Sequence, residues 1–443
     1  MIWLPPRRWS RYGRDDDGHK GHEEHQEINP KDRETNQKRE GPASDRTFSL
    51  FDSTELLPLC FFVPFVAIAS PQLAALWHGI RRHLAGIMAG DGPGGIHGGK
   101  ITGGVMMEYR RLGGSDVTIT PITLGTWAIG GWMWGGQDET DALAAIERSI
   151  GLGITSIDTA PAYGFGRAEE LIGQAIAGKR DKVQILTKYG LRWDTDRGEP
   201  FLETYDSEGR PLRMYRCSRK NSVLEECERS LRRLRTDAID VYQCHWRDHT
   251  TRVEETMEAI DKLLKDGKIR ASGVSNFSVE EIQTANQIVP QACAQPPYSM
   301  LNRRVEQDVL PFCRQHNIGV VAYSPLQRGL LTGKVPPDRE FPLGDDRRNS
   351  PYFTPANRRR VMAYLNRIRP IAEAHKATLA QLVINWTIHQ PGITAALVGA
   401  RSARQAEENA LAAGFTLSQQ EMDQINVELD QVQLDIGQQT VET

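Results

Sequence analysis

Three polar side chains follow apolar, strand-like runs of this sequence, and a tyrosine lies close behind the first of them. The runs end at Asp158, Lys188 and His245, and Tyr163 lies in the loop that follows Asp158. If the runs are parallel strands of one barrel, their carboxyl ends meet at one face, where barrel enzymes place their active sites. Each residue alone has an ordinary structural explanation. Their coincidence on three consecutive strand ends favours a catalytic cluster.

These four residue types together suit proton transfer to a carbonyl oxygen. A phenol, with an ordinary pKa of about 10, exchanges a proton near neutrality only if a cation stabilises its phenolate. We therefore expect Lys188 to stabilise the phenolate of Tyr163, and Asp158 to keep Lys188 charged and oriented. His245 is expected to hydrogen-bond the substrate oxygen. Another agent must supply hydride.

The elements that must position this cluster alternate along the chain from residue 107. Strand-like runs are predicted at 122–124, 156–158, 183–188, 239–244, 269–275, 292–295, 319–323 and 395–398. Helical patterns are predicted between them at 139–152, 168–176, 221–234, 253–266, 279–287, 306–316, 358–390 (two helices) and 402–412. This alternation predicts an α/β protein in which eight parallel strands close into a (β/α)8 TIM barrel.

Three additions to the minimal barrel are also predicted. Turn residues at 113–116 between two apolar-alternating runs indicate an N-terminal β-hairpin. Residues 190–220 and 326–357 are longer than connections require, and both follow strands, so both are expected as loops on the catalytic face. The barrel is predicted to span residues 107–430, with a C-terminal tail at 431–443.

Residues 1–105 differ in character from the rest of the chain. The polar, charge-rich segment 14–40 has too few apolar residues to offset its ordering entropy and is predicted to be disordered. The apolar stretch 56–80 is interrupted by Pro58, Pro64 and Pro71, which disfavours a membrane helix. We hypothesise that the start codon is mis-assigned and that the natural protein begins at Met106 or Met107.

Composition narrows the classes of ligand and compartment. The formal net charge of −3 provides no basic field for nucleic acid or an anionic membrane. The six cysteines form no C-x-x-C pair and no metal-type spacing, which suits reduced thiols in a cytoplasmic protein without a metal site. A small, nearly neutral substrate is expected.

The four residues, with further segments, resemble the aldo-keto reductase superfamily over about residues 108–429. The further segments are "GVSNF" at 273–277, "AQPPYSML" from 294, "VAYSPLQRGLLTGK" at 321–334 and "VGARSARQAEENA" at 398–410. The resemblance implies a catalytic tetrad of Asp158, Tyr163, Lys188 and His245. It also implies a nicotinamide cofactor held by Gly125, Thr126, Trp127, Ser275, Asn276, Gln295, Tyr323, Ser324, Pro325, Leu326, Gly329, Lys334, Gly399, Arg401, Gln405, Glu408 and Asn409.

Within that implied set, Ser275, Asn276 and Gln295 would hold the nicotinamide carboxamide and Tyr323 would stack on its ring. No G-x-G-x-x-G follows the first strand, so a Rossmann domain is not supported and the cofactor is expected across the barrel mouth.

The adenosine end of the cofactor has independent physical support. Ser402 and Gln405 have capping-box spacing, so a helix is expected to begin there, and its free N–H groups favour an anion. Arg401 beside them offers bidentate donors suited to a 2′-phosphate, which favours NADPH (NADP+) over NADH.

Aromatic residues near the expected mouth predict the substrate pocket. The first strand-to-helix loop carries Trp132 and Trp134 beside Trp127, and these could wall a pocket together with Tyr189 and Trp246.

The sequence therefore predicts NADPH-dependent reduction of aldehyde, ketone or sugar carbonyls, with Tyr163 as the proton donor. Two other functions stay open: a sugar dehydrogenase that uses the same residues in the oxidative direction, and an NADP-binding redox sensor resembling potassium-channel β subunits. The substrate and the oligomeric state also stay open at this stage.

Overall fold

The computed structural model describes residues 107–342 and 344–437. The predictions for residues 1–105 lie outside this part of the chain, as does the end of the predicted C-terminal tail.

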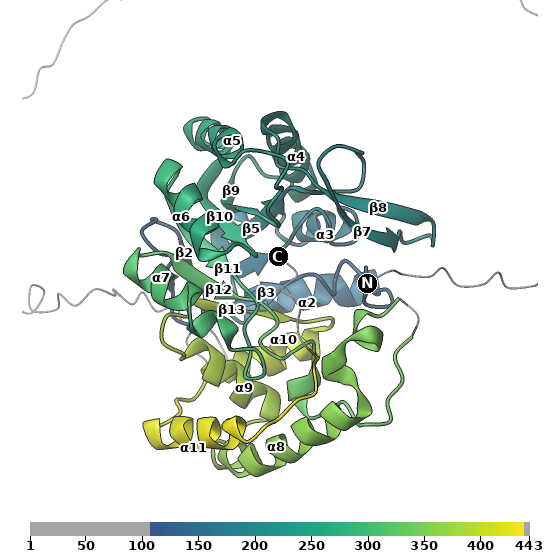
Figure 1. Cartoon of the computed structure of the whole chain (residues 1–443), viewed down its shortest axis with the longest axis vertical. Helices are drawn as coiled ribbons and strands as arrows, with labels where there is room; N and C mark the ends of the chain where they lie inside the picture. Colours follow the sequence, from purple (N-terminus) through teal and green to yellow (C-terminus); the bar gives the residue numbers. More distant parts are fainter. Residues whose placement is uncertain (1–106, 343, 438–443) are drawn as a thin grey trace, which may run out of the picture. The chain divides into compact units, whose positions relative to one another are not determined.

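A closed barrel of parallel strands forms the centre of the described chain, which confirms the predicted fold (Figure 1). The strands follow the sequence around the barrel in the order β3, β4, β5, β9, β10, β11, β12 and β13, and β13 pairs with β3 to close it. Their bounds are β3 Ile122–Gly125, β4 Ser156–Asp158, β5 Gln184–Tyr189, β9 Ile239–Cys244, β10 Ile269–Ser275, β11 Gln291–Gln295, β12 Gly319–Ala322 and β13 Ala395–Gly399.

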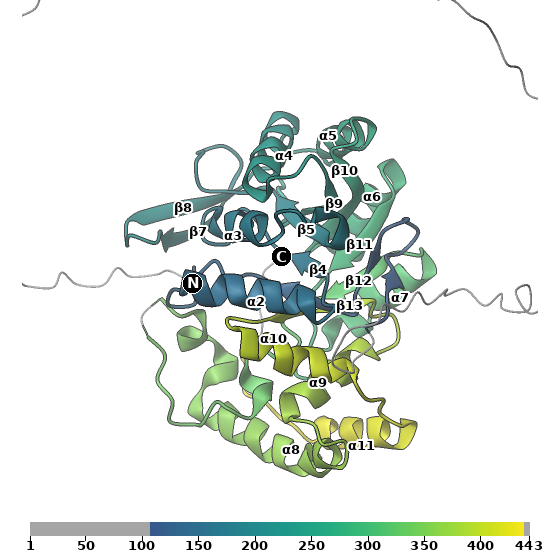
Figure 2. The ribbon, with the colours of Figure 1, turned by 180° about the vertical axis from the view of Figure 1, so that it is seen from behind.

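Helices cover the outside of the barrel (Figures 1 and 2). They are α2 Glu139–Gly151, α3 Arg167–Ala175, α4 Lys220–Leu234, α5 Val253–Lys265, α6 Val279–Ile288, α7 Val309–Gln315, α8 Pro355–Ala374, α9 Leu379–Ile388, α10 Ala403–Ala410 and α11 Gln419–Asp430. The last of these, α11, was not predicted. A capping box of Ser418 and Glu421 begins it, but it buries only Ile425 and Leu429, so its apolar pattern is weak.

The amino end of the barrel is closed by the predicted hairpin of β1 Arg110–Arg111 and β2 Thr118–Ile119. Leu112 and Ile119 are fully buried and pack with apolar side chains from the barrel strands, including Leu186, Val241 and Val321. The hairpin therefore plugs one end of the barrel with apolar contacts and leaves the other end for polar chemistry.

Residues 190–220 were predicted to be a loop. They contain instead a three-stranded antiparallel sheet, which we call the lid sheet. It consists of β6 Leu191–Arg192, β8 Pro211–Arg216 and β7 Glu199–Tyr205, in that spatial order. In Figure 1, β7 and β8 project sideways from the barrel. In β8, more exposed side chains alternate with more buried ones, which is typical of a strand with one face in solvent. The prediction of a loop overlooked this alternation.

The described residues of the second long connection, after β12, contain short 3-10 helices at Leu330–Thr332, Asp346–Asn349 and Pro351–Phe353. Within residues 107–342 and 344–437, no helix has the length and apolar character needed to cross a membrane.

Candidate active site

The carboxyl ends of neighbouring strands bring the four predicted catalytic residues together. Asp158 ends β4, Lys188 lies near the end of β5, and His245 directly follows β9. Tyr163 lies in the turn between β4 and α3. The strands β4, β5 and β9 are consecutive neighbours in the barrel, so their ends converge at one face.

Lys188 is the centre of the cluster. Its Nζ lies 2.6 Å from Oδ1 of Asp158, and both side chains are only 1% exposed. The same ammonium group donates to the carbonyl oxygen of Thr159 at 2.9 Å and to the hydroxyl of Tyr163 at 3.4 Å. A buried ion pair thus reaches the phenol.

The second oxygen of Asp158 is held by amides. Oδ2 accepts from Nε2 of Gln295 at 2.8 Å and from Nε2 of Gln243 at 3.3 Å, and the Gln295 amide also donates to Oε1 of Gln243 at 3.0 Å. Sequence reasoning missed Gln243, although it precedes His245 by two residues and strand periodicity therefore places both on one face.

His245 and Tyr163 face each other across the site. Their ring centroids are 5.8 Å apart at a nearly perpendicular angle. The backbone N–H of His245 donates to the carbonyl oxygen of Tyr189 at 2.9 Å, and its own carbonyl accepts from Nδ2 of Asn276 at 3.0 Å. The histidine backbone is thus fixed from two strands.

Burial sets the protonation of these groups. The pKa of Tyr163 is raised well above its ordinary value by burial and then by the charge of Asp158. Burial is thus the first cause of this rise, and the stabilisation of the phenolate by Lys188 stays a prediction. Burial, followed by the charge of Lys188, lowers the pKa of His245 well below its usual range. At neutral pH the site presents a neutral phenol and a neutral imidazole.

The residues predicted to hold a carboxamide form a connected group beside the tetrad. Asn276 donates to Oγ of Ser275 at 3.0 Å, and the hydroxyl of Tyr323 donates to Oδ1 of Asn276 at 2.9 Å. Ser275 donates to the carbonyl of Gln295 at 2.9 Å. Asn276 has a φ of 59°, and Ser324, next to Tyr323, has a φ of 57°. Such left-handed residues other than glycine tend to mark functional positions.

The segment after β12 continues with three consecutive residues of left-handed backbone. Gln327, Arg328 and Gly329 all have positive φ, at 46°, 52° and 91°. The N–H groups of Gln327 and Gly329 donate to the carbonyls of Ser324 and Leu326, at 2.8 and 3.0 Å, so these two groups are used within the segment itself. Lys334, further along, lies 3.2 Å from the carboxylate of Glu408 in α10.

The helix predicted near residue 402 begins there, with Ser402 as N-cap of α10 and no acidic residue in its first turn. Its capping box is incomplete, because the side chain of Gln405 accepts from the N–H of Arg401, at 2.7 Å, and not from that of Ser402. The Arg401 guanidinium donates to Oε1 of Gln137 at 2.5 Å and to the carbonyl of Gly136. Asn409, which was predicted to reach the cofactor, donates to the carbonyl of Gly399 at 3.0 Å.

The first strand-to-helix loop packs closely on the tetrad. Thr126 is buried, and its hydroxyl donates to the backbone carbonyl of Asp158 at 2.9 Å. Trp127 stands 6.5 Å from the ring of Tyr163 and 5.4 Å from that of Trp134.

Two of the predicted pocket residues contact the lid sheet. The indole N–H of Trp132 donates to Oγ1 of Thr204 at 3.0 Å, and the rings of Trp246 and Phe201 are 5.2 Å apart. Arg216 of β8 lies over both of these rings, with its Cζ 4.5 Å from the Phe201 centroid and 5.2 Å from that of Trp246. Phe201 and Arg216 were missed because their segment was predicted to be a loop.

Tyr189 does not wall the pocket. Its side chain is 1% exposed and packs in the main core, 4.8 Å from the ring of Tyr242. Since successive side chains of a strand point to opposite faces, Tyr189 faces the helices when Lys188 faces the barrel interior.

Comparisons with known proteins identify the family of this chain. A model of the aldo/keto reductase family matches residues 121–428. The chain is 39% identical to aldo-keto reductase YhdN of Bacillus subtilis (strain 168) over 327 residues, covering 73% of this chain and 94% of that protein. It is 35% identical to the NADH-specific methylglyoxal reductase of Escherichia coli (strain K12) over 318 residues, covering 70% and 95%.

Solved structures give the same result. The glycerol dehydrogenase AKR11B4 from Gluconobacter oxydans superposes with a TM-score of 0.66 at 38% identity, over 73% of this chain and 95% of that one. An aldo/keto reductase from Klebsiella pneumoniae in complex with NADP and acetate superposes with a TM-score of 0.53 at 31% identity, over 72% and 94%.

Proposed function

This chain belongs to the aldo/keto reductase family and is an oxidoreductase, and on that premise we propose that it reduces the carbonyl groups of small aldehydes, ketones or sugars. The observation that carries the proposal is the buried ion pair of Lys188 and Asp158, which reaches the hydroxyl of Tyr163 at 3.4 Å.

In the proposed reaction Tyr163 is the general acid. Its raised pKa keeps the proton on the phenol at neutral pH, where a developing alkoxide would take it. Neutral His245 would hydrogen-bond the same substrate oxygen and fix its position. Lys188 would stabilise the phenolate that remains, and Asp158 keeps that cation in place through its 2.6 Å contact.

The residues beside the tetrad fit a nicotinamide cofactor. Ser275, Asn276 and Gln295 offer hydroxyl and amide groups of the kind that pair with a carboxamide, and the left-handed backbone of Asn276 and Ser324 suits a functional constraint. Two Klebsiella pneumoniae neighbours were solved with NADP or NADPH. When bound, such a cofactor supplies hydride to the carbonyl carbon.

We further propose that NADPH is preferred over NADH. Arg401 lies at the N-terminus of α10 and is held there by Gln137, with no acidic side chain in the first turn of the helix to repel a phosphate. One relative is named as NADH-specific, so the preference depends on Arg401 in this chain and not on the family.

The oxidative direction is the second candidate function, because one structural neighbour is a glycerol dehydrogenase. Oxidation of an alcohol would start from the phenolate of Tyr163, which burial disfavours. We therefore expect reduction to dominate at neutral pH and oxidation to gain as the pH rises.

The first test is titration of the full chain with NADPH and with NADH, followed by nicotinamide fluorescence, and then a panel of aldehydes, ketones and sugars. We expect tight NADPH binding and carbonyl-dependent oxidation of the cofactor. Binding without turnover on any carbonyl would favour the redox-sensor function instead. Absence of binding would contradict the cofactor assignment.

A further inference from the structure

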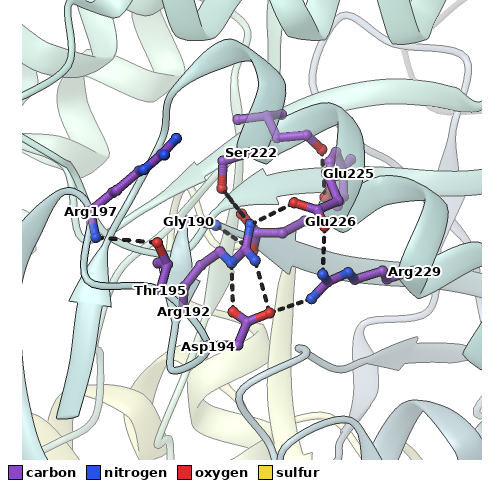
Figure 3. A network of polar contacts seen from close by, with 11 residues as sticks. Gly190, Arg192, Asp194, Thr195, Arg197, Ser222, Glu225, Glu226 and Arg229 are labelled. Atoms are coloured by element: carbon purple, nitrogen blue, oxygen red, sulfur yellow. Dashed lines mark hydrogen bonds and ion pairs between the residues drawn. The ribbon is translucent and has the colours of Figure 1, made fainter.

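A second buried carboxyl group lies behind the strand that carries Lys188. Glu226 of α4 is only 4% exposed. Its Oε2 accepts from the backbone N–H of Gly190 at 3.0 Å, and its Oε1 accepts from the hydroxyl of Ser222 at 3.1 Å (Figure 3). No step of the proposed reaction uses this group, and burying a carboxyl group is costly unless it is hydrogen-bonded.

The Gly190 peptide that Glu226 holds is the point where the barrel meets the lid sheet. Gly190 lies between β5 and β6 and has a φ of +86°, and a Cβ there would lie only 2.9 Å from Oγ of Ser218. Its carbonyl accepts from the N–H of Cys217 at 3.0 Å, directly after β8. Both ends of the lid sheet are therefore fastened at this one residue.

The same peptide unit is linked to the catalytic residues. The carbonyl of Tyr189 belongs to the peptide whose N–H is that of Gly190, and this carbonyl accepts from the N–H of His245 at 2.9 Å. Lys188 precedes Tyr189 in β5. A shift of the Gly190 peptide would therefore move the backbone of His245 and the strand end that carries Lys188.

Charged side chains extend this connection from α4 into the lid sheet. Arg192 of β6 donates to both oxygens of Asp194 at 2.8 Å and to Oγ of Ser222 at 3.0 Å, and Ser222 in turn donates to Glu226. Arg229 of α4 contacts Asp194 from the other side. Figure 3 shows these side chains converging between the root of the lid and α4.

We propose that Glu226 is a positioning residue for the reaction: its carboxylate fixes the Gly190 peptide and thereby sets both the backbone of His245 and the seat of the lid sheet. This inference rests on the proposed function. An ionised acceptor makes a stronger hydrogen bond to N–H than a neutral one, so the positioning is expected to be best when Glu226 is charged.

The surroundings of Glu226 place its titration near neutrality. Burial raises the pKa of Glu226 to about 7, and the charge of Arg192 opposes that rise. From β6 and the residues that follow it, the charged groups are Arg192 and Asp194. Burial raises the pKa of Asp194, but the hydrogen bonds from Arg192 and Arg229 outweigh burial and lower this pKa to about 2. From β5 and β9, the phenols of Tyr189 and Tyr242 have pKa values raised well above normal by burial, so both stay neutral. Cys244 of β9, whose pKa burial raises to about 12, also stays neutral.

The test compares Glu226→Gln and Glu226→Ala with the wild type in kcat/KM for a carbonyl substrate from pH 5.5 to 8.5. The matched control is Glu228→Gln, which alters a half-buried glutamate of the same helix that pairs with Lys268. Affinity for NADPH is measured in parallel.

In the wild type we expect kcat/KM to rise through a step near pH 7, by about threefold to tenfold, which is the worth of one hydrogen bond. Glu226→Gln should lack the step and stay near the low-pH level, because glutamine still accepts from Gly190 but cannot ionise. Glu226→Ala should lose up to about 10²-fold at pH 8, because a displacement of about 1 Å at a catalytic group can cost that much. NADPH affinity should change little in all variants.

The proposal is overturned if Glu226→Gln keeps the wild-type step and level. If Glu226→Ala fails to fold, the glutamine variant and its pH profile still decide. A wild type that binds NADPH but reduces no carbonyl would instead contradict the proposed function, so the two failures are distinguishable.

Discussion

The two ends of the barrel are built from the same strands but carry opposite kinds of side chain. In β5, Leu186 packs in the apolar cluster with the N-terminal hairpin, whereas Lys188, two residues further, pairs with Asp158. In β9, Val241 and Gln243 repeat this change. A step of two residues along one strand therefore separates contacts that stabilise the fold from groups that perform chemistry, as barrel enzymes generally arrange them.

The sharpest way to test this division is to remove one oxygen atom at the polar end. Tyr163→Phe should reduce turnover by about 10²- to 10⁴-fold, because it deletes the general acid and almost no volume. Binding of NADPH, measured by nicotinamide fluorescence, and the melting temperature should stay close to wild type. Tyr205→Phe, at a tyrosine of the lid sheet that is 46% exposed, is the matched control. Full activity in Tyr163→Phe would contradict the assignment of Tyr163 as the general acid.

At the apolar end the opposite result is expected. Leu186→Ala removes a fully buried side chain of the barrel interior and should lower the free energy of unfolding by about 2–5 kcal/mol. Denaturant unfolding measures this loss, and the folded fraction should keep most of its kcat. Leu411→Ala, at a leucine that is 52% exposed, should stay within about 0.5 kcal/mol of wild type. A catalytic loss as large as that of Tyr163→Phe would show that the two ends are not separable.

The comparison can be extended to the two buried carboxyl groups. Asp158 contacts a cation directly, whereas Glu226 accepts only from neutral donors. Because folding raises the pKa of Glu226 to about 7, the folded state binds its proton more readily than the unfolded state. This group therefore makes the protein less stable as the pH rises from about 4.5 to 7, by about 3 kcal/mol in total.

Glu226→Gln should remove that loss. The difference in free energy of unfolding between this variant and the wild type should shift in favour of the variant from pH 5 to pH 8, by up to about 3 kcal/mol. Denaturant unfolding at both pH values measures this difference. The same variant is expected to be less active at pH 8. An equal difference in stability at both pH values would mean that Glu226 does not titrate in this range.

The sequence was sufficient where a residue's neighbours are set by regular patterns. Short apolar runs located the barrel strands, and strand ends located Asp158, Lys188 and His245. The position of Tyr189 was wrong because the pleat of β5, which turns it away from Lys188, was not applied to it. The lid sheet was missed because its half-exposed strands have a weak apolar signal.

The protonation of the site residues depends on how deeply their side chains are buried, and the sequence pattern does not show this. The sequence indicated that Lys188 lies near Tyr163, but not that burial would be the first cause of the raised pKa of Tyr163. For the same reason Glu226 gave no signal in the sequence. A glutamate on an amphipathic helix is normally exposed, and only the packing of α4 behind β5 shows that this one is buried.

A smaller effect than those on turnover and stability is expected at the rim of the barrel, where Arg401 is proposed to select the cofactor. In the described part of the chain no carboxylate lies within ion-pair distance of Arg401. Burial and the charge of Arg347 lower the pKa of its guanidinium, and the more distant charge of Asp345 opposes them. A phosphate dianion would relieve this positive charge. Arg401→Ala should therefore weaken NADPH binding by about 10- to 100-fold, the value of one charge-assisted contact, and NADH binding by less than about threefold.

Arg404→Ala, which removes an exposed arginine of α10 that pairs with Glu408, is the control and should change neither affinity by more than about threefold. Fluorescence titration of both cofactors against both variants gives the ratio directly. An equal loss of NADPH and NADH affinity in Arg401→Ala would place the 2′-phosphate elsewhere. In that case the contacts of Arg401 with Gln137 and Gly136 would indicate a structural role, joining the first strand-to-helix loop to α10.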